Sequence, residues 1–209
     1  MKNLLKGYQR FRNEVFPQMK DHFHLLADIQ SPEVLFITCA DSRIVPNLIL
    51  QTEPGDLFLS RSVGNIVPPF GDPPSGVTST LEYAVKALKV RHVIICGHSD
   101  CGAVKAVVEK KDFSSLPVTG EWLKYVEAAW NSCDPGSTPK DPKELHTTLI
   151  YANVIAQLHN LKTHPEVISG LEKGTLQVHG WYYDILTGAI ETYNEETKRF
   201  HPLEETPSS

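Results

Sequence analysis

The sequence lacks a long hydrophobic run and an excess of positive charge. No stretch approaches the roughly 18 to 20 consecutive apolar residues of a membrane-spanning helix. The first residues, Met1 to Asn13, are charged and contain no apolar segment of the kind found in signal peptides. The formal net charge is −5, and no basic stripe runs along the chain. We therefore expect a cytoplasmic protein whose partners include neither a membrane nor nucleic acid.

Cysteine is scarce, and internal repeats and low-complexity segments are missing. The four cysteines are Cys39, Cys96, Cys101 and Cys133. They could form two disulfides, but in a cytosolic chain of this size metal binding or catalysis is the favoured use. Cys96 lies inside an apolar run and is expected in the core, whereas Cys133 is expected to be an incidental thiol. A length of 209 residues, 41% of them hydrophobic, predicts one domain over 1–209.

Apolar runs alternate with helical patterns along the first half of the chain. Strands are expected at 34–38, 56–60 and 93–96, where β-branched and apolar residues follow one another without polar interruption. Helices are expected at 77–89 and 102–110, from their apolar spacing. This alternation predicts an α/β fold whose parallel strands are joined by right-handed crossovers.

The second half predicts two long helices and then strands. The helices are expected at 114–135 and 142–171, followed by a late strand at 176–186 and a hairpin partner at 188–193. The predicted architecture is a central, mostly parallel sheet, with four parallel strands plus a late edge strand, flanked by helices.

The two ends of the chain differ from its centre. Residues 1–29 predict an N-terminal helical arm, which packs either on another subunit or on its own domain. The polar residues 195–209 predict a loose tail.

Two short segments carry the chemistry: Cys39-Ala40-Asp41-Ser42-Arg43 and His98-Ser99-Asp100-Cys101. Both follow predicted strands, and the carboxyl ends of parallel strands meet at one edge of a sheet. Cys39, His98 and Cys101 would there offer two thiolates and one imidazole, a ligand set that suits zinc. Three protein ligands with a free position are typical of catalytic zinc, whereas structural sites close all four positions.

Asp41 has more than one possible role. It could be a fourth zinc ligand, or Arg43 could engage it bidentately and hold it, ionised, away from the metal. The two residues could also form a structural pair that caps a loop. We favour the role in which Arg43 holds Asp41 away from the metal, since it leaves zinc free to activate water. The residues alone indicate metal-assisted hydration or hydrolysis without naming the substrate.

These segments resemble those of the β-class carbonic anhydrases. The resemblance also covers Glu53-Pro54-Gly55-Asp56-Leu57-Phe58 and Glu82-Tyr83-Ala84-Val85 and runs from about Gln30 to Val107. It implies that Cys39, His98 and Cys101 bind Zn²⁺ and that Asp41 and Arg43 form the gatekeeping pair. The implied reaction is reversible hydration of carbon dioxide, in which hydroxide on zinc attacks carbon dioxide and yields bicarbonate and a proton.

The resemblance is to the plant-like subgroup of that family. Gln30, nine residues before Cys39, matches a pocket glutamine whose amide can donate to an oxygen of the substrate. The hydrophobic wall would be formed by Phe58, Val63 and Tyr83, and Gly102 would begin the helix after the second segment. Phe36 stands where the other subgroup has the tryptophan of a regulatory bicarbonate site, and Ala87 stands where some plant members have a histidine proposed to shuttle protons.

The family resemblance further implies a homodimer or a larger homo-oligomer, in which the arm embraces a neighbour. Two other functions stay open at this point. One is a carbon disulfide or carbonyl sulfide hydrolase on the same scaffold. The other is a zinc-stabilised binding module without turnover.

Overall fold

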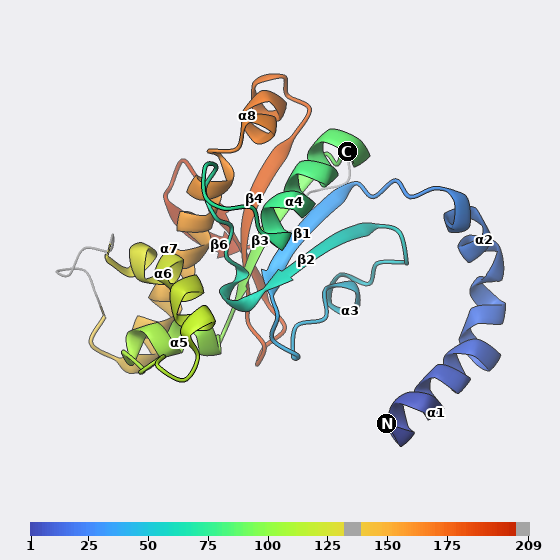
Figure 1. The fold of residues 1–209 in the computed structure, drawn as a ribbon, viewed down its shortest axis with the longest axis horizontal. Coiled ribbons are helices and arrows are strands. Elements are labelled where there is room, and N and C mark those ends of the chain that lie inside the picture. The colour runs from blue at the N-terminus through green and yellow to red at the C-terminus, as the bar shows by residue number, and fades with distance from the viewer. Residues whose placement is uncertain (132–138, 204–209) are drawn as a thin grey trace.

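Four parallel strands form the centre of the molecule. In this computed structural model, which describes residues 1–131 and 139–203, the sheet has the order β2-β1-β3-β4-β5-β6 (Figure 1). The parallel strands are β1 (Val34–Cys39), β2 (Leu57–Ser62), β3 (His92–His98) and β4 (Gln177–Tyr183). The mostly parallel α/β architecture expected from the sequence is confirmed.

The central strands are buried on both faces, which explains their unbroken apolar runs. On one face Leu35 and Ile37 pack in a core with α4 (Gly76–Glu82) and α7 (Pro142–Leu161). On the other face a second cluster contains Phe36, Ile94 and Cys96, partly covered by Leu50 of α3 (Pro46–Leu50) and by Trp181. Cys96 is thus a core residue, as expected.

The helices largely follow the sequence pattern, with breaks at identifiable residues. The expected helix at 142–171 is two helices, α7 and α8 (Pro165–Glu172), because Pro165 disfavours helical geometry at the residue before it. The expected helix at 77–89 consists of α4 and a π-helical turn, Tyr83–Leu88, and it ends at Lys89 with a φ of 60°. The remaining helices on the body are α5 (Gly102–Val108) and α6 (Pro117–Asn131). Cys133 lies outside the described residues.

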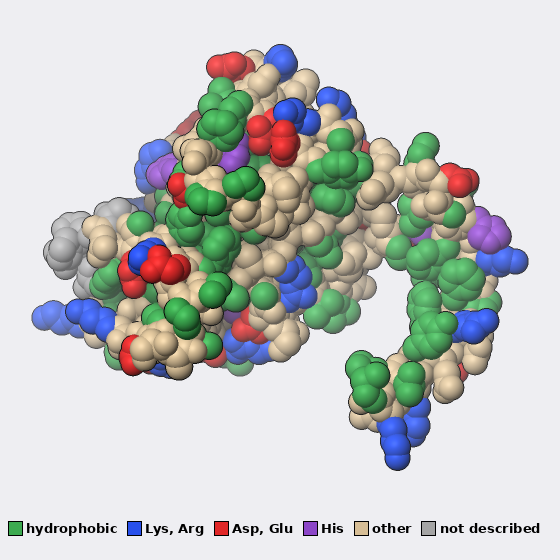
Figure 2. All heavy atoms as spheres, viewed as in Figure 1, with side chains coloured by type: hydrophobic (Ala, Val, Ile, Leu, Met, Phe, Trp, Pro, Cys, Tyr) green, Lys and Arg blue, Asp and Glu red, His purple; other side chains and the backbone are tan. Residues whose placement is uncertain are grey.

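The N-terminal arm projects from the body (Figure 1). It contains α1 (Lys2–Arg10), a π-helical turn, a 3₁₀ turn and α2 (Lys20–Asp28), and none of their residues is buried. Figure 2 shows hydrophobic side chains gathered along it. Leu4, for example, is 71% exposed. An arm of this kind leaves an apolar surface for which the chain itself supplies no cover.

The expectation of a loose tail is wrong for its first part. After β5 (Ile190–Asn194), the chain turns and returns as β6 (Arg199–Pro202), antiparallel to it. Asn194 Oδ1 accepts hydrogen bonds from two backbone amides of the turn. Phe200 stacks on Tyr151 with ring centroids 4.2 Å apart. One aromatic side chain thus anchors an otherwise polar segment to the core.

Within the described residues, no helix is both long and apolar enough to cross a membrane.

The contact between α7 and β4 yields a stability prediction. A Cβ at Gly180 would lie 2.7 Å from Leu158 Cδ1 and 3.0 Å from Val154 Cγ1. We expect Gly180→Ala to lower the free energy of unfolding by about 1–3 kcal/mol through overpacking, measured by denaturant titration. Gly76→Ala is the control, because a Cβ there meets no atom within 4 Å. Equal stability of both variants and the wild type would contradict the close packing.

Candidate metal centre and active site

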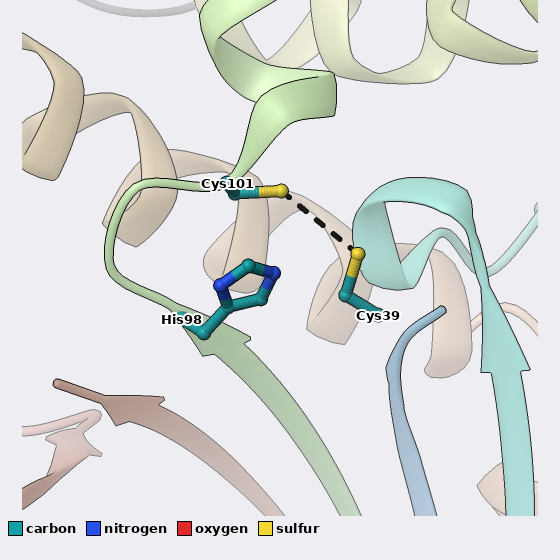
Figure 3. A group of neighbouring side chains, drawn as sticks. All are labelled: Cys39, His98 and Cys101. Atoms are coloured by element: carbon teal, nitrogen blue, oxygen red, sulfur yellow. Dashed lines mark hydrogen bonds between the residues drawn. The ribbon is translucent and has the colours of Figure 1, made fainter. Parts of the chain in front are cut away.

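The two predicted segments meet at the carboxyl edge of the parallel sheet. Cys39 ends β1, His98 ends β3, and Cys101 lies directly before α5. The sulfur atoms of Cys39 and Cys101 are 4.0 Å apart, and the ligand atoms of all three residues lie within 4.8 Å of one another. Figure 3 shows these side chains pointing toward one another. The predicted convergence of the three residues is therefore present in the fold.

The turn between His98 and Cys101 fixes the direction of the two side chains. The Ser99 amide donates to the Tyr183 carbonyl at 2.9 Å, which holds the turn on β4. Asp100 adopts a left-handed φ of 53° and reverses the chain. Nδ1 of His98 donates to the Ser99 carbonyl at 2.9 Å, so the hydrogen of the neutral ring sits on Nδ1. This leaves Nε2 as the free ligand atom.

The donor set fits a zinc ion. His98 Nε2 is buried and has no hydrogen-bond partner among the described residues. A buried polar atom without a partner is costly, and a metal ion beside two sulfur atoms would satisfy it. Two cysteines and one histidine are ligands that zinc prefers, and they leave one tetrahedral position free.

The Cys39 sulfur lies in surroundings that favour the thiolate. Its pKa is lowered, first by the Cys101 sulfur 4.0 Å away and further by the neighbouring His98 ring and the nearby backbone of Gly64 and Asp41, against the opposing effect of burial. The pKa of Cys101 is raised, because it faces the Cys39 sulfur and is itself buried. The two sulfur atoms thus favour one thiolate between them, and the thiolate is the form of cysteine that binds a metal.

The Asp41 carboxylate is turned toward Arg43. Oδ1 accepts from the Arg43 backbone amide at 2.9 Å and from Nε at 3.0 Å, and Oδ2 accepts from a terminal guanidinium nitrogen at 2.8 Å. These bonds hold the pKa of Asp41 well below its usual range. Oδ2 nevertheless lies only 3.9 Å from His98 Nε2. The carboxylate thus borders the metal site while its hydrogen bonds are made to arginine.

Two residues that support this arrangement, Asp100 and His146, were not predicted from the sequence. Asp100 accepts from Arg43 through its side chain at 3.1 Å and through its carbonyl at 3.0 Å. His146, in which the sequence showed no signal, lies with Nε2 3.1 Å from the Cys101 carbonyl. Asp100 could have been recognised as a second carboxylate within the segment, whereas nothing along the chain relates His146 to a residue so far away.

The predicted pocket residues fall into two groups in one chain. Val63 and Gly102 lie at the carboxyl edge, beside the cysteines. Phe58 pairs with Leu35 near the start of β1, and its ring lies 6.0 Å from that of Tyr83. Four register positions, about 13 Å along a strand, separate Phe58 from the level of Cys39.

Gln30 belongs to the distant group. It precedes β1 by four residues and is exposed. A single chain therefore does not bring Gln30, Phe58 and Tyr83 to the metal-binding edge.

An α/β fold with a Cys-His-Cys group at the carboxyl edge of its parallel sheet defines a class of zinc enzymes with an open coordination position. The family model described as carbonic anhydrase matches residues 34–190. The chain belongs to the β-class carbonic anhydrases, which are zinc-dependent lyases. It is thus an enzyme for carbon dioxide hydration, and the non-catalytic zinc module is excluded.

Relatives and solved structures agree along nearly the whole chain. A carbonic anhydrase of Pseudomonas aeruginosa is 43% identical over 99% of this chain and 94% of its own length. The structure of the β-carbonic anhydrase CcaA is similar with a TM-score of 0.92 and 39% identity, covering 97% of this chain and 98% of that one. A Coccomyxa β-carbonic anhydrase in complex with acetazolamide has a TM-score of 0.80 and 31% identity, covering 91% and 84%.

Removing one thiol tests the metal centre. Loss of a residue that hydrogen-bonds to a metal ligand typically weakens metal binding by roughly 10- to 100-fold. We expect Cys39→Ser, which removes a ligand itself, to weaken zinc binding by more than this. Zinc per chain and competition with a chromophoric chelator measure the effect. Cys96→Ser is the matched control, since Cys96 is a buried cysteine of the same sheet outside the group. Zinc retention equal to that of the control would rule out Cys39 as a ligand.

Proposed function

We propose that Cys39, His98 and Cys101 bind the zinc ion and that Asp41 and Arg43 keep its fourth position available to water. The observation that carries this proposal is the buried, unpartnered Nε2 of His98 beside two sulfur atoms. Bound zinc supplies a Lewis acid that makes water nucleophilic near neutral pH, an effect best known from a carbonic anhydrase with three histidine ligands.

In this proposal Asp41 and Arg43 act as one unit. Arg43 holds the carboxylate ionised with three hydrogen bonds, so that Asp41 is not drawn onto the metal. The Asp41 carboxylate can then accept a hydrogen bond from water at the site and orient it. Asp100 holds the other edge of the Arg43 guanidinium and keeps the group in place.

In the proposed pocket, Gln30, Phe58 and Tyr83 come from a second copy of the chain. Gln30 is exposed and Tyr83 is 50% exposed, although an apolar pocket would cover them, and Val63 at the metal edge is 42% exposed. The projecting arm offers the apolar surface that such an association would bury. Solved relatives from Sordaria macrospora are described as tetrameric β-carbonic anhydrases. A homodimer or larger homo-oligomer would thus place the distant group of one copy against the metal edge of another.

Carbon dioxide suits the pocket formed in this way. Phe58, Val63 and Tyr83 would form an apolar wall, which favours a small uncharged molecule over water. The Gln30 amide would donate to a substrate oxygen as negative charge develops during formation of bicarbonate. We keep carbon dioxide as the substrate over carbon disulfide and carbonyl sulfide, because the relatives are named carbonic anhydrases. The free thiols of Cys39, Cys96 and Cys101 support a reducing, cytoplasmic location.

Stopped-flow hydration of carbon dioxide tests the role of the Asp41–Arg43 pair. We expect Asp41→Asn and Arg43→Gln, each loaded with zinc, to lose roughly 10²-fold in kcat, because the reacting water is no longer oriented. Lys86→Gln is the control: it removes an exposed ion pair with Glu82 on the helical surface. Full activity in both pair variants would disprove the proposed role, and full zinc without hydration in the wild type would disprove the proposed function.

A mixing experiment tests the shared pocket. Gln30→Ala and Cys39→Ser each damage a different part, so both are expected to have low activity. If the parts come from different copies, mixed oligomers contain some sites with an intact Gln30 and an intact Cys39. Unfolding and refolding the two variants together should then give more hydration than the sum of the separately refolded proteins. No gain, with mixed oligomers demonstrated by mass spectrometry, would show that each chain builds its own pocket.

A further inference from the structure

The backbone carbonyl of Cys101 is held from two sides. Figure 3 shows Cys101 at the start of α5. Its carbonyl accepts a hydrogen bond from the Lys105 backbone amide at 2.9 Å, which is the first bond of that helix. Nε2 of His146 lies 3.1 Å from the same oxygen. Because a carbonyl only accepts, the hydrogen of the neutral His146 ring sits on Nε2, and both acceptor positions of the oxygen are then used.

His146 reaches this carbonyl because it shares a face of α7 with core residues. Leu149 and Ile150 follow it by three and four residues, so they lie on the same side of the helix, and both are buried. They belong to the apolar cluster that also contains Cys39 and Cys101. The His146 ring is half-buried. The helix face that packs on the two cysteines therefore also carries the histidine.

The contact between α7 and β3 is tight beside the metal-binding edge. At Gly97, directly before His98, a Cβ would lie 2.8 Å from Val154 Cγ2 and 2.9 Å from Ile150 Cγ2. Contacts this short leave no space for a side chain, so glycine permits the helix to lie this close to the strand. The helix is therefore fixed against the strand that ends in His98, one turn along from His146.

Buried amides fix α7 further along its length. Asn153 Nδ2 donates to the Gly64 carbonyl at 2.9 Å, and Gln157 Oε1 accepts from the Val67 amide at 2.8 Å. Both side chains are fully buried. Buried amides are costly unless they are bonded, so these bonds hold the helix to the Val63–Val67 segment. The histidine thus extends from a helix whose position is specified both by packing and by hydrogen bonds.

The Cys101 sulfur lies where a tetrahedral metal ion requires it. Two sulfur atoms that are each about 2.3 Å from zinc stand about 3.8 Å apart at the tetrahedral angle. The sulfur atoms of Cys39 and Cys101 are 4.0 Å apart, which is close to this spacing. The ψ angle of Cys101, 115°, relates the direction of its carbonyl to that of its side chain. A bond that fixes the carbonyl therefore also restricts the position of the sulfur.

We propose that His146 is a positioning residue: by holding the Cys101 carbonyl, it keeps the Cys101 sulfur at metal-binding distance from the other two ligands. The inference rests on the proposed zinc ligation by Cys101. The hydrogen bond from His146 is made to the backbone of a ligand and not to a reacting atom. Residues behind metal ligands set the direction of those ligands, and their loss typically weakens metal binding by roughly 10- to 100-fold.

The rate of zinc release from the zinc-loaded protein tests the inference without measuring turnover. We expect His146→Leu, which removes the ring N–H, to release zinc to an excess of chromophoric chelator roughly tenfold faster, since lower affinity appears mainly in the dissociation rate. His146→Gln offers an amide N–H near the position of Nε2 and should release zinc at close to the wild-type rate. His159→Leu is the matched control, because His159 is an exposed histidine of the same helix.

Cobalt substitution gives a second readout of the Cys101 sulfur. The thiolate-to-cobalt charge-transfer band weakens when a sulfur moves off the metal, so we expect a weaker band in His146→Leu than in the wild type or in His146→Gln. Thermal unfolding of each variant separates this effect from stability. A purely structural role predicts a lower melting temperature for His146→Leu with an unchanged band and an unchanged release rate, and that result would overturn the inference.

The conservative variant decides whether the donated hydrogen bond is the cause. Equally fast zinc release from His146→Leu and His146→Gln would show that it is not, and would also overturn the inference. Should His146→Leu fail to fold, His146→Met, which likewise has no N–H to donate, takes its place. A wild-type cobalt protein without a thiolate band would instead contradict the proposed ligation by the cysteines, so the two failures are distinguishable.

Discussion

The parallel register between β1 and β3 is the constraint on which the site depends. Thr38 pairs with Cys96, so Cys39 and His98 leave the sheet at the same edge, within one residue of the same level. The apolar faces of both strands set this register, since a slip by one residue would move Leu35 and Ile37 to the opposite face. The hydrophobic core thus determines where the Cys39 and His98 side chains lie. The turn from His98 to Cys101 then places the second sulfur beside them.

Around this edge the structure arranges charge in two opposed ways. The sulfur atoms and the imidazole are buried and converge on one point. The Asp41 carboxylate borders that point but is bonded to Arg43, which is bonded in turn to Asp100. The buried sulfur and imidazole atoms therefore converge where a metal ion would fit, whereas the neighbouring Asp41 carboxylate is already paired with the Arg43 guanidinium. In the proposed site this difference would keep the fourth metal position open, because the Asp41 carboxylate already has three hydrogen bonds to Arg43.

Much of this could be predicted from the sequence, because the signals are local. The unbroken run Val34–Thr38 specifies a strand buried on both faces, and the spacing within Cys39-x-Asp41-x-Arg43 allows a bidentate contact without knowledge of the fold. The distant relations could not be read in this way. Phe200 lies in a polar tail and becomes part of β6 only because it stacks on Tyr151, far away in the sequence. Asn153 and Gln157 are polar residues within a helix, a pattern typical of an exposed face, and only the position of the Val63–Val67 segment explains their burial. Gln30, Phe58 and Tyr83 match pocket positions along the chain, yet one chain holds them away from the cysteines, and the sequence contains no signal for the second copy that the proposed pocket requires.

The central proposal for this protein is a zinc site between copies of the chain, with Cys39, His98 and Cys101 as its protein ligands. Anomalous diffraction at the zinc edge from crystals of the zinc-loaded protein tests it most directly. We expect one peak per chain at about 2.3 Å from each sulfur and about 2.0 to 2.1 Å from His98 Nε2, with Gln30 from a second copy facing it across the pocket. A peak bound by other residues, or a peak at this group with Gln30 of every copy far from it, would contradict the account.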